Sequence, residues 1–250
     1  MTCLPCKTKI VATIGPATES QEMMERLIRA GMSIGRLNFS HGNFAGHAEW
    51  IRKLRAAAKA VGRPIVLMAD LPGPKMRIGS IAPDPVTLKV GDPFFLTTEE
   101  VPGTPQRVSV SFKRLPAVVQ KGRRLYLNDG LVQLLVERVN GNDVYCRVEA
   151  GGELRSKKGL NLPGMDLGMS AFTEHDRACL EFAIKNGVDA VSQSFVENAA
   201  DMEAVRTAAR ELGGNPFLIA KIERAGALEH YDEILAATDG IMVARGDLGL

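Results

Sequence analysis

The chain has 250 residues, of which 45% are hydrophobic and 24% are charged, and its formal net charge is +2. This balance is typical of a globular protein and excludes a disordered chain, a collagen-like repeat and a coiled coil. There is no apolar run of about 18 residues that could cross a membrane. The 31 Lys and Arg residues against 29 Asp and Glu give no basic field for nucleic acid or a membrane surface. The N-terminus lacks the apolar core of a signal peptide, so we expect a cytoplasmic protein.

The four cysteines do not form the framework of a disulfide-rich domain in a chain of this length. Cys3 and Cys6 make a single Cys-x-x-Cys, with no second Cys/His pair at zinc spacing and no strand-to-helix turn around it. We therefore expect neither a zinc site nor a redox role at these two residues.

Short apolar runs alternate with helical periods over the first 71 residues. Strands are predicted at Lys9–Gly15, Ser33–Phe39 and Pro64–Leu71. The helix between the first two strands is predicted to begin with the capping signal Thr18-x-x-Gln21 and to stop at Gly31. An Ala- and Arg-rich helix ending near Val61 precedes the third strand, whose almost continuous apolar run is typical of a strand buried on both faces of a parallel sheet.

The pattern changes between residues 72 and 168. This segment holds nine of the 13 prolines and almost no helical period. β-like runs at Val86–Val90 and Leu131–Val139, followed by a hairpin turn at Asn140-Gly141, indicate a β-rich module. We predict a separate domain over 72–168, inserted after the third strand.

After Ser170 the alternation of helices and strands returns. Helices are predicted from Thr173 to about Asn186, around Met202 up to Gly213, and over Ala227–Ala237, with strands at Asp189–Phe195, Phe217–Glu223 and Gly240–Ala244. Six strands joined by crossovers predict one parallel α/β domain made of residues 1–71 and 169–250. These segments are much shorter than the about 250 residues of a complete eight-stranded barrel. We therefore predict an incomplete (β/α)8 barrel that lacks two βα units, with an open doubly wound sheet as the alternative.

Polar residues occupy alternate positions at the end of the second strand. Arg36, Asn38 and Ser40 point to one side, and Leu37 and Phe39 point to the other. Unpaired polar groups in a buried strand are costly, so these three side chains must have partners. For a lone arginine, pairing with a structural carboxylate is the alternative, but three polar residues in register favour a ligand site.

A second polar group lies at the ends of the fifth and sixth strands. Lys221 and Glu223 alternate at the carboxyl end of one strand, and Asp247 follows the next strand between two glycines. Ligands bind at this end of α/β sheets, and glycines let the backbone approach a ligand closely. Two carboxylates beside a lysine suit a Mg²⁺ ion that holds substrate oxygens, with an internal Lys221–Glu223 ion pair as the alternative. Together these features predict a site for an anionic, oxygen-rich substrate.

Other catalytic motifs are absent from the sequence. It contains no Walker loop, no G-x-G-x-x-G and no H-E-x-x-H. His47, His175 and His230 fall on predicted helices, and we expect all three at the surface.

Seven segments of the chain resemble the pyruvate kinase family and occur in the family's order: KTKIVATIGPAT (7–18), RLNFSHG (36–42), DLPGPKMR (70–77), LNDG (127–130), SKKGLNLPG (156–164), KIER (221–224) and ARGDLG (244–249). The resemblance covers nearly the whole chain. It implies a barrel with a mobile β-domain inserted after the third strand. It also implies a glycolytic phosphotransferase that transfers the phosphoryl group of phosphoenolpyruvate to ADP, giving pyruvate and ATP.

The resemblance implies roles for individual residues. Arg36 would bind the transferring phosphate, and Lys221 would neutralise charge on the phosphoryl group and the enolate oxygen, so these two would be the catalytic residues. Glu223 and Asp247 would hold Mg²⁺ or Mn²⁺. Further matches are Gly246 with Asp247 for substrate binding, Asn38, His41, Arg77 and Lys158 for nucleotide binding, with Arg77 also reaching the phosphate from the hinge, and Asp129 in the lid that would close over the site.

The family's monovalent-cation site matches Asn38, Ser40, Asp70 and the backbone carbonyl of Leu71. Potassium-dependent members carry Thr, Lys and Glu where this chain has Leu71, Pro72 and Lys75. A lysine ammonium in place of that glutamate can supply the charge of the monovalent ion. We therefore expect that K⁺ is not required.

The family continues beyond ARGDLG through two more barrel strands and a C-terminal regulatory domain. An end at Leu250 would leave open sheet edges, which favour aggregation or pairing with another chain. We therefore do not expect the 250-residue chain alone to be a competent monomeric catalyst, and we expect the family's homo-oligomer, a tetramer, only of a complete chain.

Two alternatives to a kinase stay open. One is a non-catalytic truncated remnant that binds phosphoenolpyruvate or nucleotide. The other is a Mg²⁺-dependent pyruvate-enolate lyase or aldolase. The inserted domain with Asp129 and Lys158 disfavours the second, because an aldolase has no nucleotide to cover.

Overall fold

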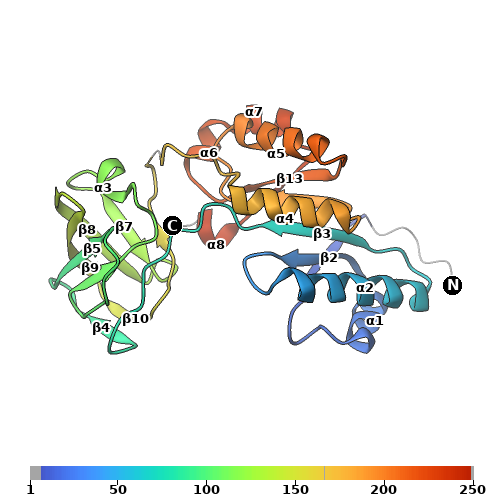
Figure 1. Ribbon diagram of the computed structural model, residues 1–250, viewed down its shortest axis with the longest axis horizontal. Coiled ribbons are helices and arrows are strands. Elements are labelled where there is room, and N and C mark those ends of the chain that lie inside the picture. Colours follow the sequence, from blue (N-terminus) through green and yellow to red (C-terminus); the bar gives the residue numbers. More distant parts are fainter. Residues whose placement is uncertain (1–6, 166, 249–250) are drawn as a thin grey trace. The chain divides into compact units, whose positions relative to one another are not determined.

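The computed structural model describes residues 7–165 and 167–248, and of Asp247 only the backbone. Cys3 and Cys6 lie outside these residues. The described chain forms two compact units (Figure 1). Unit 1 consists of the residues up to Pro74 together with Ala171–Ile222 and His230–Val243, and unit 2 of Lys75–Ser170, Glu223–Glu229 and the residues from Ala244. No helix in the described ranges is long and apolar enough to cross a membrane.

Unit 1 is built on a six-stranded parallel sheet in the order β1-β2-β3-β12-β13-β14. The strands are β1 (Ile10–Thr13), β2 (Met32–Asn38), β3 (Val66–Leu71), β12 (Ala190–Gln193), β13 (Phe217–Ile222) and β14 (Gly240–Val243). Neighbouring strands follow one another in chain order without reversal, as in a (β/α)8 barrel. A doubly wound sheet reverses its order at a switch point, so that alternative is wrong. The fold is α/β, with six barrel strands and a separate β-rich unit inserted after the third.

Helices follow the strands along the chain. They are α1 (Gln21–Ala30), α2 (Phe44–Val61), α4 (Glu174–Lys185), α5 (Ala199–Glu211), α6 (Gly226–Glu229), α7 (Tyr231–Ala237) and α8 (Arg245–Leu248). Figure 1 shows α4 lying along β3 and α1 beside α2. The buried residues of α4 are Asp176, Cys179, Leu180 and Ala183. Their spacing of three to four residues places one face of the helix against the sheet.

Helix ends follow local capping chemistry. The predicted start of a helix at Thr173 is confirmed, and this residue caps α4: its hydroxyl accepts a hydrogen bond from the N–H of Asp176 while the Asp176 carboxylate accepts one from the N–H of Thr173. The prediction at Thr18 is wrong. Ser20 caps α1, and the Thr18 hydroxyl instead accepts a hydrogen bond from the N–H of Gly15 in the preceding turn.

The prediction of one continuous helix over Ala227–Ala237 is also wrong. The structure has two short helices there, α6 and α7, which are separated at His230. Gly31 ends α1 as predicted, with φ +118°, a conformation that side chains with a Cβ atom rarely adopt.

Unit 2 has two sheets of its own. The larger has the order β11-β7-β8-β9-β5-β6, and β10 pairs with β4 in the smaller. The elements are β4 (Val86–Leu88), β5 (Pro93–Thr97), β6 (Arg107–Ser109), α3 (Leu115–Val118), β7 (Arg124–Leu127), β8 (Val132–Asn140), β9 (Asp143–Ala150), β10 (Gly152–Leu154) and β11 (Leu160–Asn161). The predicted hairpin is confirmed, but its loop is Gly141-Asn142, one residue later than expected, with Gly141 at φ +56°.

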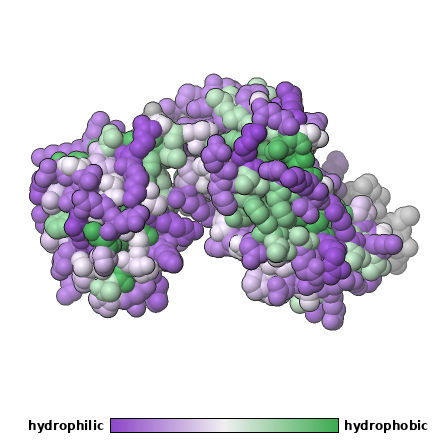
Figure 2. Space-filling view, in the orientation of Figure 1, coloured by the Kyte–Doolittle hydropathy of each residue, from purple (hydrophilic) through white to green (hydrophobic). Residues whose placement is uncertain are grey.

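Apolar residues fill the interior of unit 2. Its buried core includes Phe94, Leu96, Leu125, Leu134 and Cys146, each 0% exposed. Figure 2 shows hydrophilic residues over most of the visible face of each unit, with apolar residues in smaller patches. The β-rich unit therefore has a hydrophobic core of its own.

His47 contradicts the expectation of a surface residue, because it is 1% exposed. Its ring lies on that of Phe39, with the centroids 4.4 Å apart. Nε2 lies 2.9 Å from the carbonyl oxygen of His41, and because a carbonyl only accepts hydrogen bonds, Nε2 carries the proton. Burial lowers the pKa of His47. His175 and His230 are exposed as expected.

Candidate active site

The carboxyl ends of four parallel strands bring polar side chains together in unit 1. In the register of the sheet, Asp70 of β3 pairs with Asn38 of β2 on one side and with Ser192 of β12 on the other. Lys221 lies one residue before the end of β13, the next strand. Parallel strands all end at the same edge of the sheet, so these residues meet where α/β proteins bind ligands.

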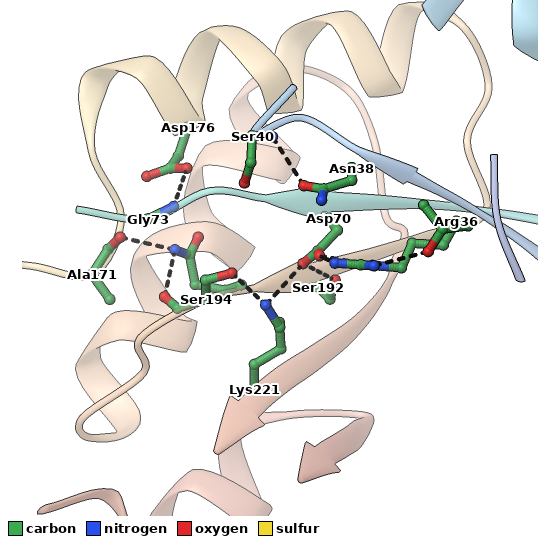
Figure 3. Close-up of polar contacts among 12 residues, drawn as sticks. Arg36, Asn38, Ser40, Asp70, Gly73, Ala171, Asp176, Ser192, Ser194 and Lys221 are labelled. Atoms are coloured by element: carbon green, nitrogen blue, oxygen red, sulfur yellow. Dashed lines mark hydrogen bonds and ion pairs between the residues drawn. The ribbon is translucent and has the colours of Figure 1, made fainter. Parts of the chain in front are cut away.

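Asp70 is the centre of the resulting cluster (Figure 3). One carboxylate oxygen accepts hydrogen bonds from Nε of Arg36, at 2.8 Å, and from Nη2 of the same residue. The other oxygen accepts a hydrogen bond of 2.7 Å from the hydroxyl of Ser192 and lies 3.5 Å from Nζ of Lys221. One carboxylate is therefore shared by two cations, with hydrogen bonds of the stronger, charge-assisted kind.

Two further hydroxyls contact the cations. Thr13 Oγ1 accepts a hydrogen bond of 2.9 Å from Nη1 of Arg36, and Ser194 Oγ accepts one of 2.7 Å from Nζ of Lys221. Sequence reasoning missed Thr13, Ser192 and Ser194. Alternation at the end of β12 could have found the two serines, which are two residues apart, but Thr13 requires the pairing of β1 with β2.

Arg36 and Lys221 both contact the carboxylate of Asp70, so two cations lie beside this one acidic side chain. The side chain of Asp70 is 3% exposed, that of Lys221 10% and that of Arg36 25%. Arg36 does pair with a carboxylate, which is the structural alternative for a lone arginine. Burying a second cation beside the same carboxylate is costly, however, and an anionic ligand would offset that cost.

The other predicted residues of unit 1 lie at the ends of β2 and β3 or directly after β2. Asn38 Oδ1 accepts a hydrogen bond of 3.0 Å from the backbone N–H of Ser40, which lies in the turn that follows β2. His41 is exposed, and its N–H donates to the carbonyl of Asn38 at 3.2 Å. Leu71 is fully buried at the end of β3.

Three predicted residues belong to the described part of the inserted segment in unit 2. Nη1 of Arg77 donates a hydrogen bond of 2.9 Å to the carbonyl of Lys157, the residue before Lys158. Asp129 is exposed and has φ +56°, directly after Asn128 at φ +53°. Asn and Asp are the non-glycine residues that adopt this left-handed conformation most readily, so the sequence Asn128-Asp129 suits the tight turn that presents Asp129.

The predicted metal ligands also belong to unit 2. Glu223 follows β13 directly and is 4% exposed. Asp247 and Gly246 lie in α8, but the side chain of Asp247 is outside the described residues. Over residues 7–165 and 167–248, no three His, Cys, Asp or Glu side chains are grouped as a metal site. Glu223 nevertheless supplies buried carboxylate oxygens of the kind that Mg²⁺ prefers.

Comparison with known proteins decides the family. Residues 6–250 match the family model described as pyruvate kinase, barrel domain. The chain belongs to the pyruvate kinase family. The match confirms the resemblance seen in the seven sequence segments, and it spans residues of both units.

Curated pyruvate kinases from archaea and bacteria are similar over nearly the whole chain. The pyruvate kinase of Thermococcus litoralis is 47% identical over 244 residues, which are 98% of this chain and 51% of the relative. Pyruvate kinase 2 of Synechocystis sp. is 44% identical over 99% of this chain and 42% of its own length, and the pyruvate kinase of Mycobacterium intracellulare is 42% identical over 97% and 51%. The chain thus spans about half the length of the curated pyruvate kinases it matches.

Proposed function

We propose that this protein transfers the phosphoryl group of phosphoenolpyruvate to ADP, giving pyruvate and ATP. The observation that carries the proposal is the cluster of Arg36, Asp70 and Lys221, in which two cations share one buried carboxylate at the ligand-binding end of a parallel sheet. Membership of the pyruvate kinase family supports it. In this role the protein would be a cytoplasmic glycolytic enzyme that assembles as a homo-oligomer.

Arg36 and Lys221 would bind the oxygens of the phosphoryl group. Each Nη atom of Arg36 carries two N–H donors, and Asp70 and Thr13 each take one, so the guanidinium keeps donors for an anion. Phosphoryl transfer needs in-line positioning and concentrated positive charge more than covalent help from the protein. Lys221 would stabilise the enolate oxygen as negative charge develops on it, and Asp70 would keep both cations in place.

Glu223 and Asp247 would hold a divalent cation, Mg²⁺ or Mn²⁺. When bound, this ion would neutralise charge on the substrate oxygens. We propose Gly246 as a further substrate-binding position, and Asn38, His41, Arg77 and Lys158 as nucleotide contacts. Asp129, in the inserted domain over 72–168, would close over the site and exclude water that could otherwise accept the phosphoryl group.

We further propose that activity does not require K⁺. Two of the side chains that would hold K⁺ already have partners within the chain: Asp70 contacts two cations and Ser192, and Asn38 Oδ1 accepts from the N–H of Ser40. Lys75 would supply a fixed positive charge where potassium-dependent relatives carry a glutamate. A bound K⁺ would therefore add charge that the site does not need.

The main test measures pyruvate formation by coupled NADH oxidation with phosphoenolpyruvate, ADP and Mg²⁺. Lys221→Met should lower kcat by about 10²–10³-fold, the usual cost of losing one preorganised group that stabilises transition-state charge. Lys185→Met is the matched control, because Lys185 also lies in unit 1 but its side chain is 71% exposed. Equal rates for the two variants would contradict the role of Lys221.

The same assay tests the potassium proposal in a buffer whose only monovalent cation is tetramethylammonium. Adding KCl at saturating substrate should leave the rate of the parent protein unchanged, whereas Lys75→Glu should become dependent on K⁺. Lys89→Glu, at an exposed lysine of the same unit, is the control and should remain independent of K⁺. Stimulation of the parent protein by K⁺ would overturn the proposal.

A further inference from the structure

The inserted segment Lys75–Ser170 joins unit 1 through two short stretches of chain, both of which belong to unit 1. One leaves after β3 through Pro72–Pro74, and the other returns through Ala171–Thr173 before α4. Although these stretches are far apart in sequence, buried side chains of unit 1 bind the backbone of both.

Asp176, in the first turn of α4, contacts both connections, and Figure 3 shows its contact with Gly73. Its Oδ1 accepts a hydrogen bond of 2.9 Å from the N–H of Gly73, which is 103 positions away. Its Oδ2 accepts hydrogen bonds from the N–H of Thr173, at 2.8 Å, and from the Thr173 hydroxyl, at 2.5 Å. The residue is 0% exposed, so a single buried carboxylate holds the outgoing and the returning chain together.

Two more buried side chains hold the returning connection at Ala171. Asp201 Oδ1 accepts a hydrogen bond of 2.8 Å from the N–H of Ala171, and Gln193 Nε2 donates one of 2.8 Å to its carbonyl. Gln193 Nε2 also donates to the carbonyl of Ser194 at 3.0 Å. The backbone N–H and C=O of Ala171 are thus both bound by side chains that water does not reach.

These contacts converge on Ser194, the residue that also binds the catalytic lysine. Gly73 packs directly on Ser194: its φ is +65°, and a Cβ atom placed there would lie 2.9 Å from the carbonyl oxygen of Ser194. The hydroxyl of Ser194 accepts the hydrogen bond from Lys221. Ser194 therefore contacts Gly73 of the outgoing connection and Lys221. Its carbonyl also accepts a hydrogen bond from the side-chain amide of Gln193, which binds Ala171 of the returning connection.

We propose that Asp176 is a positioning residue that clamps the two connections of the inserted domain together and, through Ser194, keeps them in a fixed position relative to Lys221. Asp176 lies outside the Arg36–Asp70–Lys221 cluster, so its loss should leave those contacts in place while the two connections separate. The clamp follows from contacts within unit 1. Its effect on phosphoryl transfer rests on the proposed function.

The test measures distances between spin labels at Arg26→Cys in unit 1 and Lys121→Cys in unit 2, both exposed positions. Cys3 and Cys6 are replaced by serine, and the buried Cys146 and Cys179 stay in place because labels do not reach them. Double electron–electron resonance should give a broader distance distribution for Asp176→Asn than for the parent chain. An unchanged distribution would overturn the proposal.

Asp189→Asn is the matched control, because Asp189 also accepts a hydrogen bond from a backbone N–H of unit 1, that of Leu67 at 2.8 Å, but holds neither connection. Its distribution should equal that of the parent, and equal broadening in both variants would count against the clamp. If Asp176→Asn does not fold, Gly73→Ala provides the second test, because its Cβ would push the outgoing connection off Ser194 and should broaden or shift the distribution.

Calorimetric titration of the same proteins with phosphoenolpyruvate and Mg²⁺ separates the two proposals. Broadening in Asp176→Asn together with no binding by the parent chain would support the clamp and contradict the proposed function. Binding by the parent without broadening in Asp176→Asn and Gly73→Ala would overturn the clamp alone.

Discussion

The two units differ in what they bury. Among the described residues, unit 1 buries four charged side chains, Asp70, Asp176, Asp201 and Lys221, whereas unit 2 buries only Glu223. The inserted part of unit 2 has an apolar interior, and its charges form ion pairs nearer the surface, such as Arg124 with Glu149 and Arg147 with Glu137.

The two units therefore differ in what stabilises them and in how many charged side chains they bury. Burial of apolar area stabilises a fold by about 25 cal/mol per Å², whereas a buried charge is costly unless it is paired and hydrogen-bonded. Unit 2 can therefore rely on its hydrophobic core. Unit 1 keeps charged groups at one end of its sheet, where we propose that they bind an anion, and additional hydrogen bonds must hold them there.

The two buried free cysteines allow the units to be followed separately. Cys179 lies in unit 1 and Cys146 in unit 2, and burial raises the pKa of each thiol to about 12. Because the thiolate is the reactive form, neither should react with a thiol reagent until its unit opens. With Cys3 and Cys6 replaced by serine, labelling of each thiol against urea concentration reports the unfolding of its own unit.

The largest effect on stability should come from Asp70→Asn. Removing this carboxylate leaves the buried Lys221 and the part-buried Arg36 without their shared counter-charge, and loss of one partner from a buried pair costs about 3–5 kcal/mol. Labelling of Cys179 should therefore shift to a lower urea concentration, while labelling of Cys146 should not.

Asp143→Asn provides the matched loss of a carboxylate in unit 2. Asp143 pairs with Arg107 while 27% of its side chain is exposed, and such partly exposed pairs contribute about 1 kcal/mol or less. Equal shifts for Asp70→Asn and Asp143→Asn would contradict the proposed contrast between the units.

A substitution in the apolar core of unit 2 should destabilise unit 2 rather than unit 1. Leu134 is 0% exposed in the core of unit 2, and replacing such a leucine with alanine costs about 2–5 kcal/mol through lost burial and the cavity left behind. Leu134→Ala should lower the urea concentration at which Cys146 is labelled. Phosphoenolpyruvate binding, for which we propose the Arg36–Asp70–Lys221 cluster of unit 1 as the anion site, should change little at low temperature, and a loss of binding equal to that of a cluster variant would contradict the separation.

The smallest predicted effect is a loss of stability at acid pH that depends on His47. Burial lowers the pKa of His47 below its ordinary 6.5, so the folded chain takes up this proton less readily than the unfolded chain. The stability contributed by neutral His47 is therefore present above pH 6.5 and is lost as the pH falls through 6.5 toward the lowered pKa. Labelling of Cys179 should show this loss, whereas Cys146 should not, since all four histidines lie in unit 1.

His47→Gln should remove this acid-dependent loss, because the glutamine side chain does not titrate. His175→Gln, at an exposed histidine of the same unit, should keep it. If both variants retained the same pH dependence, another group would have to be responsible.

Much of the fold could be predicted because its signals are local. Buried parallel strands are short apolar runs, and the change to a β-rich composition after Leu71 marks the inserted segment. The burial of His47 could have been predicted as well, since it shares a helix face with Ile51 and Leu54, at spacings of four and seven residues. The cap of α1 could not, because Thr18 and Ser20 are both capping residues and a hydrogen bond to Gly15 decides between them.

Residues of the candidate site could be predicted only where the sequence pattern lies within a single strand. Alternation alone identified Arg36 and Lys221, which lie near the carboxyl ends of two apolar strands. Thr13 required knowledge of which strands are neighbours, and the contact of Asp176 with Gly73 joins residues 103 positions apart. Such contacts depend on the assembled sheet, so a pattern within one segment does not contain them.

Isothermal titration of phosphoenolpyruvate with Mg²⁺ into the chain tests the central claim most directly, namely that the Arg36–Asp70–Lys221 cluster is an anion site. We predict that the parent chain binds and that Arg36→Met weakens binding by at least about tenfold, since hydrogen bonds to charged groups contribute about 1.5–3 kcal/mol. Arg26→Met, at an exposed arginine of unit 1, should bind like the parent. No binding by the folded parent, or equal binding by Arg36→Met, would contradict the account.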